Sequence, residues 1–385
     1  MTTGGLGRVH TQRAVLFAQD GPLVLSSGST LAPVEVAYET YGTLDADAAN
    51  AVFVAHALSG DAHAAGHHGD PSRRGWWDTL IGPGRPLDTD RFFVICPNLL
   101  GGCGGTTGPA SIDPRTDRAY GLRFPLLSVR DLVTVHRALL VHLGISRLHA
   151  AVGGSLGGMQ VLQWALDHPE EVDRAVLVCA SSRLNAQNIA LSAVARAAIM
   201  SDPNFRGGDY LDGPLRPRHG LALARKIGHI TYLSVDSMQR KFDRARRGAA
   251  DAPMTMSSDF EVEHYLDHQG ESFLERFDAL SYLYLTRLMD YFDPFAEPEQ
   301  TPGRMATRFL AISFDSDWRF GSEHSRHLVA ELQERGVHAH HVEISSPWGH
   351  DSFLLEDERY HRLVAEALLA DPVAPAPGRL RADAI

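Results

Sequence analysis

The stretch that decides the fold reads Ala150-Ala151-Val152-Gly153-Gly154-Ser155-Leu156-Gly157-Gly158-Met159-Gln160. A short apolar run leads into a glycine-rich turn, and a helical pattern continues from there to about Asp167. The segment Gly153-x-Ser155-x-Gly157 has the spacing of a nucleophile elbow, in which a serine occupies a strained turn between a strand and a helix. Neighbours without a Cβ atom make that turn possible, and the first N–H groups of the helix point at an oxyanion formed there. The same glycines could serve only the close packing of a strand on a helix, so the rest of the chain must supply a histidine and an acid.

Composition narrows the classes of protein to consider. The 385 residues suffice for a large buried core, and the net charge of −11 comes without a run of basic residues of the kind that binds nucleic acid. The three cysteines (Cys96, Cys103 and Cys179) are odd in number and lack C-x-x-C spacing, which argues against a disulfide framework or a zinc site. The first residues lack a targeting pattern, and no apolar run approaches the ~20 residues of a spanning helix. We therefore expect a cytoplasmic protein without membrane or nucleic-acid partners.

Apolar runs of strand length alternate with helical patterns through the first half of the chain. The expected strands of this part are Ala51–Leu58, Phe92–Asn98, a short strand that begins at Ala150, and Arg174–Ala180, preceded by an antiparallel pair formed by Leu23–Ser27 and Val34–Thr43. Ser128 and Asp131 have the spacing of a capping box and open an amphipathic helix over Val129–Leu143. Such alternation predicts a mostly parallel sheet with right-handed crossovers and helices on both faces, an α/β fold.

The pattern changes at Arg183 and becomes almost entirely helical up to about Asp293. Helices are expected at Ile189–Met200, Leu221–Ser234 and Phe273–Phe292 of this insertion, which would cover the elbow as a lid. Strand and helix patterns resume at Arg308–Ser313, Gly321–Arg335, Ala339–Ile344 and Glu356–Leu369. The predicted division is 1–182 and 301–372 for the two parts of the α/β core, 183–300 for the helical lid and 373–385 for a loose tail.

Acidic residues and a histidine follow the last two predicted strands. Asp315 and Asp317 come after the strand at 308–313, and His350 comes after the strand at 339–344. The chain order Ser155, acid, His350 is that of a nucleophile–acid–base triad at the carboxyl edge of a parallel sheet. His350 would act as general base and Asp317 would hold its tautomer, with Asp315 as the rival acid. The plain alternative for His350 is a surface loop histidine, since the chain has 20 histidines.

Two backbone N–H groups are candidates for an oxyanion hole. One belongs to Leu156, the residue after the nucleophile, and the other to Leu58, where the strand that begins at Ala51 passes into its loop. Leu58 would at the same time be a core residue.

Longer motifs along almost the whole chain resemble those of the homoserine O-acetyltransferases, acyl-CoA-dependent enzymes of methionine biosynthesis with an α/β-hydrolase fold. The matching segments are His56–His63, Asn98–Pro109, Gly153–Gln160, Gly220–Arg225, Ile227–Ser234, Gln269–Gly270, Arg276–Asp278, Ser281–Thr286, Ser316–Trp318 and Gly349–Asp351. The resemblance implies that acetyl-CoA and L-homoserine are the substrates, that Asp317 rather than Asp315 is the acid, and that the insertions form a homodimer. Two departures stand near the acid: Arg319 and Gly321 replace what is usually an apolar residue and a proline.

The resemblance also implies the contacts to a zwitterionic substrate. It places a guanidinium for the homoserine carboxylate at Arg225, and Asp351, next to His350, suits the ammonium group. Tyr232 lies two helical turns after Arg225 and would face the same ligand. No tightly bound cofactor and no metal are expected, with acetyl-CoA as co-substrate.

Several alternatives remain open on the sequence. The same scaffold would serve a homoserine O-succinyltransferase or a serine O-acyltransferase, because the donor and acceptor depend on a few cavity residues. An esterase differs only in admitting water to the acyl-enzyme. A non-catalytic binding protein is the remaining possibility.

Overall fold

A computed structural model describes residues 5–19, 21–248, 253–296 and 305–369. Its centre is an eight-stranded sheet, whose strands lie in the order β1 (Gln12–Leu16), β4 (Val34–Tyr41), β8 (Phe93–Pro97), β5 (Ala51–Ala55), β11 (Ala150–Gly154), β12 (Arg174–Val178), β13 (Arg308–Phe314) and β14 (Ala339–Ile344). The strands from β8 to β14 run parallel, and β4 is antiparallel to both β1 and β8. The predicted mostly parallel α/β sheet is confirmed.

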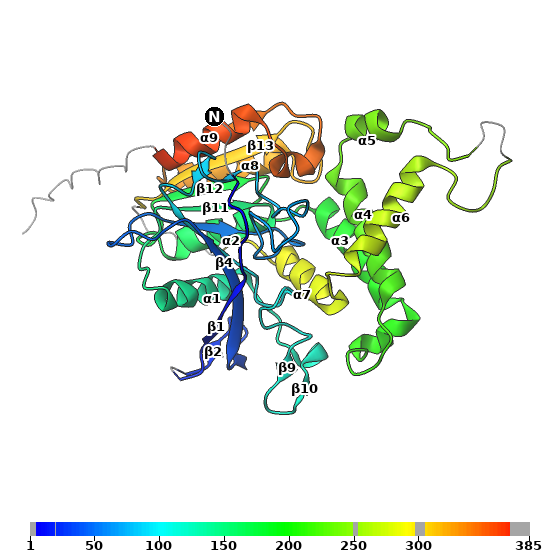
Figure 1. The fold of residues 1–385 in the computed structure, drawn as a ribbon, viewed down its shortest axis with the longest axis horizontal. Coiled ribbons are helices and arrows are strands. Elements are labelled where there is room, and N and C mark those ends of the chain that lie inside the picture. Colours follow the sequence, from blue (N-terminus) through cyan, green and yellow to red (C-terminus); the bar gives the residue numbers. More distant parts are fainter. Residues whose placement is uncertain (1–4, 20, 249–252, 297–304, 370–385) are drawn as a thin grey trace, which may run out of the picture.

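Helices cover both faces of this sheet (Figure 1). Leu132 of α1 (Val129–His142), Leu162 of α2 (Leu156–Asp167) and Leu328 of α8 (Ser322–Glu334) belong to one apolar core, whereas Val364 of α9 (Glu358–Leu369) belongs to a second core. Every residue of β5, β11 and β12 is buried, as expected for parallel strands enclosed between two layers. The carboxyl ends of the parallel strands therefore open at one edge, where their loops gather.

Five helices lie between β12 and β13. They are α3 (Ala186–Met200), α4 (Arg218–Tyr232), α5 (Val235–Phe242), α6 (Glu261–Phe273) and α7 (Ala279–Asp290). Figure 1 shows α3 to α6, in green and yellow, beyond the end of the sheet, with α7 nearer to it. The single helix predicted over 273–292 is wrong at its start: α6 ends at Phe273, and Asp278 caps a new helix by accepting from the N–H groups of Leu280 and Ser281.

The antiparallel pair predicted from Leu23–Ser27 and Val34–Thr43 is also wrong in one of its two strands. The strand antiparallel to β4 is β1, which alternates exposed and buried residues at its end, as a strand with one face on the core does. Leu23–Val24 (β2) instead pairs with Thr30–Leu31 (β3) across a tight turn, where Gly28 adopts φ +80°. The turn brings the chain back within six residues, so this segment closes on itself rather than extending along β4.

The remaining elements are short and lie in the loops. They are β6 (Ile81–Gly82), β7 (Leu87–Asp88), β9 (Ile112–Asp113), β10 (Arg118–Ala119), and the 3-10 helices Gly121–Arg123, Pro203–Gly208 and Gly349–Leu354. The predicted tail at 373–385 and the proposed boundary at residue 300 lie outside the described residues.

Within the described parts of the chain, no helix combines the length and the apolar character that a membrane crossing requires.

Candidate active site

Ser155 sits in the turn between β11 and α2 with φ 57° and ψ −123°. A non-glycine residue at positive φ is strained, and such strain is typical of functional turns. The N–H of Ser155 donates to the Val178 carbonyl at 2.8 Å. A Cβ atom on Gly157 would come within 2.0 Å of the Ala55 carbonyl oxygen, and one on Gly153 within 2.3 Å of the Gly157 backbone. The glycines are thus needed for the close approach of α2 to the sheet, as the elbow pattern predicts.

His350 and Asp317 come together from two different loops. His350 lies in the 3-10 helix after β14, Asp317 lies after β13, and 2.7 Å separates His350 Nδ1 from Asp317 Oδ2. The other carboxylate oxygen, Oδ1, accepts from the N–H groups of Arg319 and Phe320, both at 2.9 Å. The Phe320 ring stacks on the imidazole with 5.1 Å between centroids. The other ring nitrogen of His350, Nε2, does not contact Asp317 and remains available to accept or donate a proton.

Electrostatics keep Asp317 ionised. Burial alone would raise the pKa of this carboxyl, but the charge and hydrogen bond of His350 and the two backbone donors outweigh it, so its pKa lies below the ordinary value. A carboxylate in this position fixes the orientation of the ring and stabilises its protonated form.

The rival acid has another partner. Asp315 accepts from the Ser346 N–H at 3.0 Å through Oδ1 and so ties the loop after β13 to the loop after β14. Of the two unusual residues, Arg319 contributes an N–H to Asp317, and Gly321 is the residue before α8. Neither departure takes Asp317 away from His350.

One cavity of about 230 Å³ brings most of the predicted residues together. Its wall contains Leu58, Ser155, Arg225, Tyr232, His350 and Asp351, which come from four separate segments of the chain. Leu156 is the first residue of α2, where N–H groups lack a partner within the helix. All eight residues predicted from the sequence therefore line this cavity or adjoin it.

Two opposite charges face the cavity without an ion-pair partner among the described residues. Arg225 donates from Nη1 to the Ser59 hydroxyl at 3.1 Å and lies over the Phe273 ring, with its guanidinium carbon 4.6 Å from the centroid. Among the described residues, neither Arg225 nor Asp351 forms an ion pair. Burial raises the pKa of Asp351, and the nearby charges of His350 and Arg225 oppose that shift. Such a pair complements a ligand with one carboxylate and one ammonium group.

His56 is a residue that the motif comparison left without a role. The Leu99 N–H donates to its Nε2 at 3.1 Å, so the proton lies on Nδ1, which donates to the Ala57 carbonyl at 2.7 Å. The Gly60 N–H donates to the same carbonyl at 3.0 Å. The Ala57 carbonyl and the Leu58 N–H belong to one peptide group, and in a trans peptide these two groups point in opposite directions. The Leu58 N–H therefore points away from His56 Nδ1 and the Gly60 N–H. Its place at the end of a buried strand was the signal that could have identified His56.

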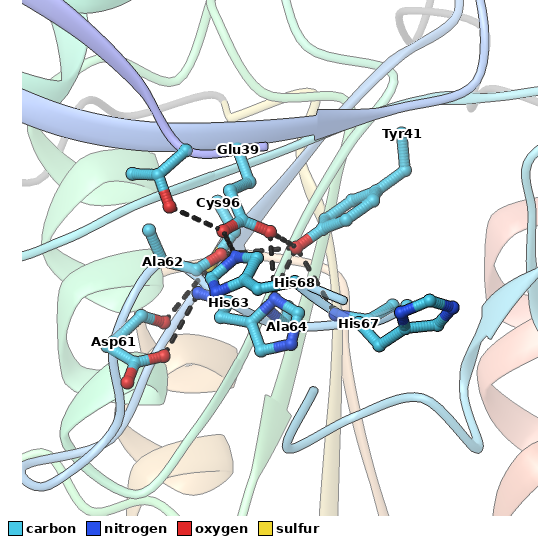
Figure 2. A network of polar contacts seen from close by, with 12 residues as sticks. Glu39, Tyr41, Asp61, Ala62, His63, Ala64, His67, His68 and Cys96 are labelled. Carbon is cyan, nitrogen blue, oxygen red and sulfur yellow. Dashed lines mark hydrogen bonds and ion pairs between the residues drawn. The ribbon is translucent and has the colours of Figure 1, made fainter. Parts of the chain in front are cut away.

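A second histidine–carboxylate group lies outside the cavity (Figure 2). The fully buried Glu39 on β4 accepts hydrogen bonds from the Thr11 and Tyr41 hydroxyls at 2.8 and 2.9 Å. His63 Nδ1 and His68 Nε2 approach the same carboxylate at 3.0 and 2.6 Å. These three side chains also have the composition and proximity of a metal site, which no short sequence spacing reveals. The four polar partners already satisfy the carboxylate, so we describe the group as a hydrogen-bond network.

Comparisons with known proteins agree with this geometry. The family model of the alpha/beta hydrolase fold matches residues 50–357. The chain is 59% identical to a homoserine O-succinyltransferase of Nocardioides sp. over 95% of this chain and 100% of the relative, and 48% identical to a homoserine O-acetyltransferase of Rhodospirillum rubrum over 91% and 90%. The crystal structure of homoserine O-acetyltransferase from Bacillus anthracis superposes with a TM-score of 0.86 at 30% identity, covering 95% of this chain and 99% of that one.

The fold, the elbow and the histidine–acid pair define an enzyme of the α/β-hydrolase class. Within that class, the chain belongs to the homoserine O-acyltransferase family.

Proposed function

We propose that this enzyme transfers a succinyl group from succinyl-CoA to the γ-hydroxyl of L-homoserine, a step of methionine biosynthesis. Family membership supports the acceptor and the use of an acyl-CoA. The unpaired Arg225 and Asp351 support it further, because homoserine presents a carboxylate and an ammonium group to such a pair.

The observation that carries the donor assignment is Arg319. Its guanidinium carbon lies 6.0 Å from the centroid of the Tyr232 ring, a ring that lines the cavity, and Nη1 donates to the Thr231 hydroxyl at 3.2 Å. Among the described residues, Arg319 forms no ion pair with a carboxylate. Arg319 lies beside the cavity wall, next to Tyr232, rather than in the wall itself. With Arg225 assigned to homoserine, this second guanidinium without a carboxylate partner suits a donor with a terminal carboxylate, which succinyl has and acetyl lacks.

The reaction would proceed in two half-reactions. His350 takes the proton of Ser155, whose Oγ attacks the thioester carbon, and the N–H groups of Leu156 and Leu58 hold the oxyanion. The carbon–sulfur bond breaks, coenzyme A leaves with the proton from His350, and the acyl group remains on Ser155. The homoserine hydroxyl then gives its proton to His350 and attacks the ester, and the proton returns to Ser155 as O-acylhomoserine leaves.

Acetyl-CoA is the second candidate donor. The sequence resemblance implies it, and the Rhodospirillum rubrum relative and the Bacillus anthracis structure bear acetyltransferase names. Thiol release with each donor, in the presence of homoserine, separates the two. Our proposal expects kcat/KM at least about tenfold higher for succinyl-CoA, which corresponds to ~1.4 kcal/mol of transition-state discrimination. A preference for acetyl-CoA would contradict the proposal.

Arg319→Leu tests the residue behind the donor assignment. Loss of one charge-assisted contact should raise the KM for succinyl-CoA about tenfold and leave the constants for acetyl-CoA within about twofold. Equal changes with both donors would mean that Arg319 only supports the loop of Asp317. The matched control is Arg326→Leu. It removes an exposed arginine of α8 that pairs with Glu343 on β14 and is not among the predicted site residues.

The acceptor and the association state also require measurement. Product analysis with homoserine, serine or water as the only acceptor distinguishes transfer to homoserine from serine acylation and from ester hydrolysis. The homodimer implied by the family resemblance stays a prediction, and light scattering of the purified chain tests it.

A further inference from the structure

Two cations near the mouth of the cavity, Lys241 and Arg276, have no anionic partner among the residues that the structure describes. The chain contains two lysines, Lys226 and Lys241. Lys226 forms an ion pair with Asp267, whereas no carboxylate among the described residues pairs with Lys241. Arg276 likewise forms no ion pair in the described part of the chain, and both Lys241 and Arg276 are exposed. Exposed cations without a carboxylate partner can bind an anionic ligand.

Contacts connect Lys241 with the cavity wall. Its Nζ lies 4.2 Å from the centroid of the Tyr265 ring on α6, and the Tyr265 hydroxyl lies 3.1 Å from His229 Nδ1. His229 lines the cavity. Burial first, and then the charges of Arg225, Lys241 and Arg276, lower the pKa of His229 to about 3. Lys241 is therefore separated from the cavity by the thickness of one tyrosine and one histidine.

Arg276 approaches the same cavity from the segment between α6 and α7. It belongs to the cavity wall, and its Nη1 donates to the Ser59 carbonyl at 2.6 Å. The guanidinium carbon lies 5.3 Å from the centroid of Phe273, the ring that Arg225 also covers. Arg276 thus places a charge at the rim, beside the loop that carries Leu58.

The segment around Lys241 is locally basic, although the chain as a whole is acidic. Residues 240–247 contain five lysines or arginines, a short run that the net charge of −11 conceals. Three of them pair with acids: Arg240 with Asp236, Arg246 with Asp259 and Arg247 with Glu261. Lys241 is the member of this run that stands next to a tyrosine bonded to the cavity wall.

We propose that Lys241 and Arg276 bind the phosphate groups of the coenzyme A moiety while its thioester reaches Ser155. Homoserine has no net charge, so it gives these cations no partner beyond those already assigned. Coenzyme A carries a pyrophosphate and a 3′-phosphate, and its pantetheine arm separates them from the thioester, which places the phosphates at the mouth of the cavity. The inference rests on the proposed function, because it assumes an acyl-CoA donor.

Two donors that share one thioester separate phosphate binding from chemistry. The first is succinyl-CoA, and the second is succinyl-N-acetylcysteamine, which lacks the nucleotide and every phosphate. Lys241→Ala should raise the KM for succinyl-CoA about tenfold, the value of one charge-assisted contact, and leave kcat/KM for the short thioester unchanged. Lys226→Ala is the matched control and should change neither donor.

A binding measurement makes the test independent of turnover. In calorimetry, adenosine 3′,5′-bisphosphate should bind the wild-type chain and the Lys226→Ala variant with equal affinity. It should bind the Lys241→Ala and Arg276→Ala variants about tenfold more weakly. Equal KM changes with both donors, or unchanged bisphosphate binding in Lys241→Ala, would overturn the proposal. Bisphosphate binding that depends on Lys241, in a chain that acylates no homoserine, would uphold this site and overturn the proposed function.

Discussion

Two buried carboxylates in the described part of the chain contact histidines, and one of these groups shares a cavity with a serine nucleophile. Asp317 meets His350, and Glu39 meets His63 and His68. Hydrogen bonds occupy both oxygens of each carboxylate and hold the pKa of each below its ordinary value although burial acts in the opposite sense. The local chemistry of the two groups is therefore closely similar.

Their surroundings differ. His350 lines the cavity together with Ser155, whereas neither His63 nor His68 contributes to that wall. The Glu39 group instead joins Thr11, the residue before β1, to β4 and to the loop that follows Leu58, and the Tyr41 hydroxyl accepts from the Ala64 N–H at 2.8 Å (Figure 2). The contrast teaches that a histidine–carboxylate contact acquires catalytic meaning only from the third side chain and the space around it.

The largest expected effect comes from removing that third side chain. Ser155→Ala should lower kcat at least about 10⁴-fold, because no acyl-enzyme can form, while the melting temperature stays close to that of the wild type. Initial rates of thiol release and thermal unfolding provide the two readouts. Undiminished acyl transfer would mean that the Asp317–His350 pair, like the Glu39 group, has no nucleophile to activate.

The acid of the pair is the next test. Asp317→Asn should lower kcat by about 10³–10⁴, since an amide neither holds the required tautomer nor stabilises the imidazolium. Asp315→Asn is the matched control, and its kcat should stay within a few-fold of the wild type. A larger loss from Asp315→Asn than from Asp317→Asn would reverse the assignment of the acid.

Glu39→Gln should have the smallest effect on turnover and a clear effect on stability. At neutral pH we expect a loss of about 1–3 kcal/mol in the free energy of unfolding, with kcat within a few-fold, because a buried network loses its charged acceptor. The folded-state pKa of Glu39 is lower than its ordinary value of 4.5, so its carboxylate stabilises the fold above that value and the contribution disappears as the pH falls through the folded pKa. Denaturant unfolding of both proteins should show a gap that narrows below about pH 4.5. If the difference in unfolding free energy stayed constant from neutral to acid pH, the substitution would act through the shape of the side chain and not through its charge.

Much of the candidate site could be predicted because its residues lie at strand ends. Ser155, Asp317 and His350 follow three parallel strands, and parallel strands bring their carboxyl ends to one edge. Sequence spacing alone could not decide between Asp317 and Asp315, because both follow the same strand. That choice depended on the family resemblance.

The remaining features depend on contacts between distant segments. The partners of Glu39 stand 28, 24 and 29 residues away at Thr11, His63 and His68, and no short pattern links them. The start of the helix predicted over 273–292 was wrong because Phe273 and Phe277 continue the apolar pattern of α7 back to the end of α6, and the cap at Asp278 resembles an ordinary helical residue in sequence. Lys241 is connected to the cavity wall through Tyr265, a contact between α5 and α6.

Mass spectrometry of the chain incubated with succinyl-CoA alone tests the central claim most directly. The account predicts one added succinyl group, located on the peptide that contains Ser155, with release of one equivalent of thiol and loss of the adduct when homoserine is added. An unmodified Ser155, in a preparation that still acylates homoserine when both substrates are present, would contradict it.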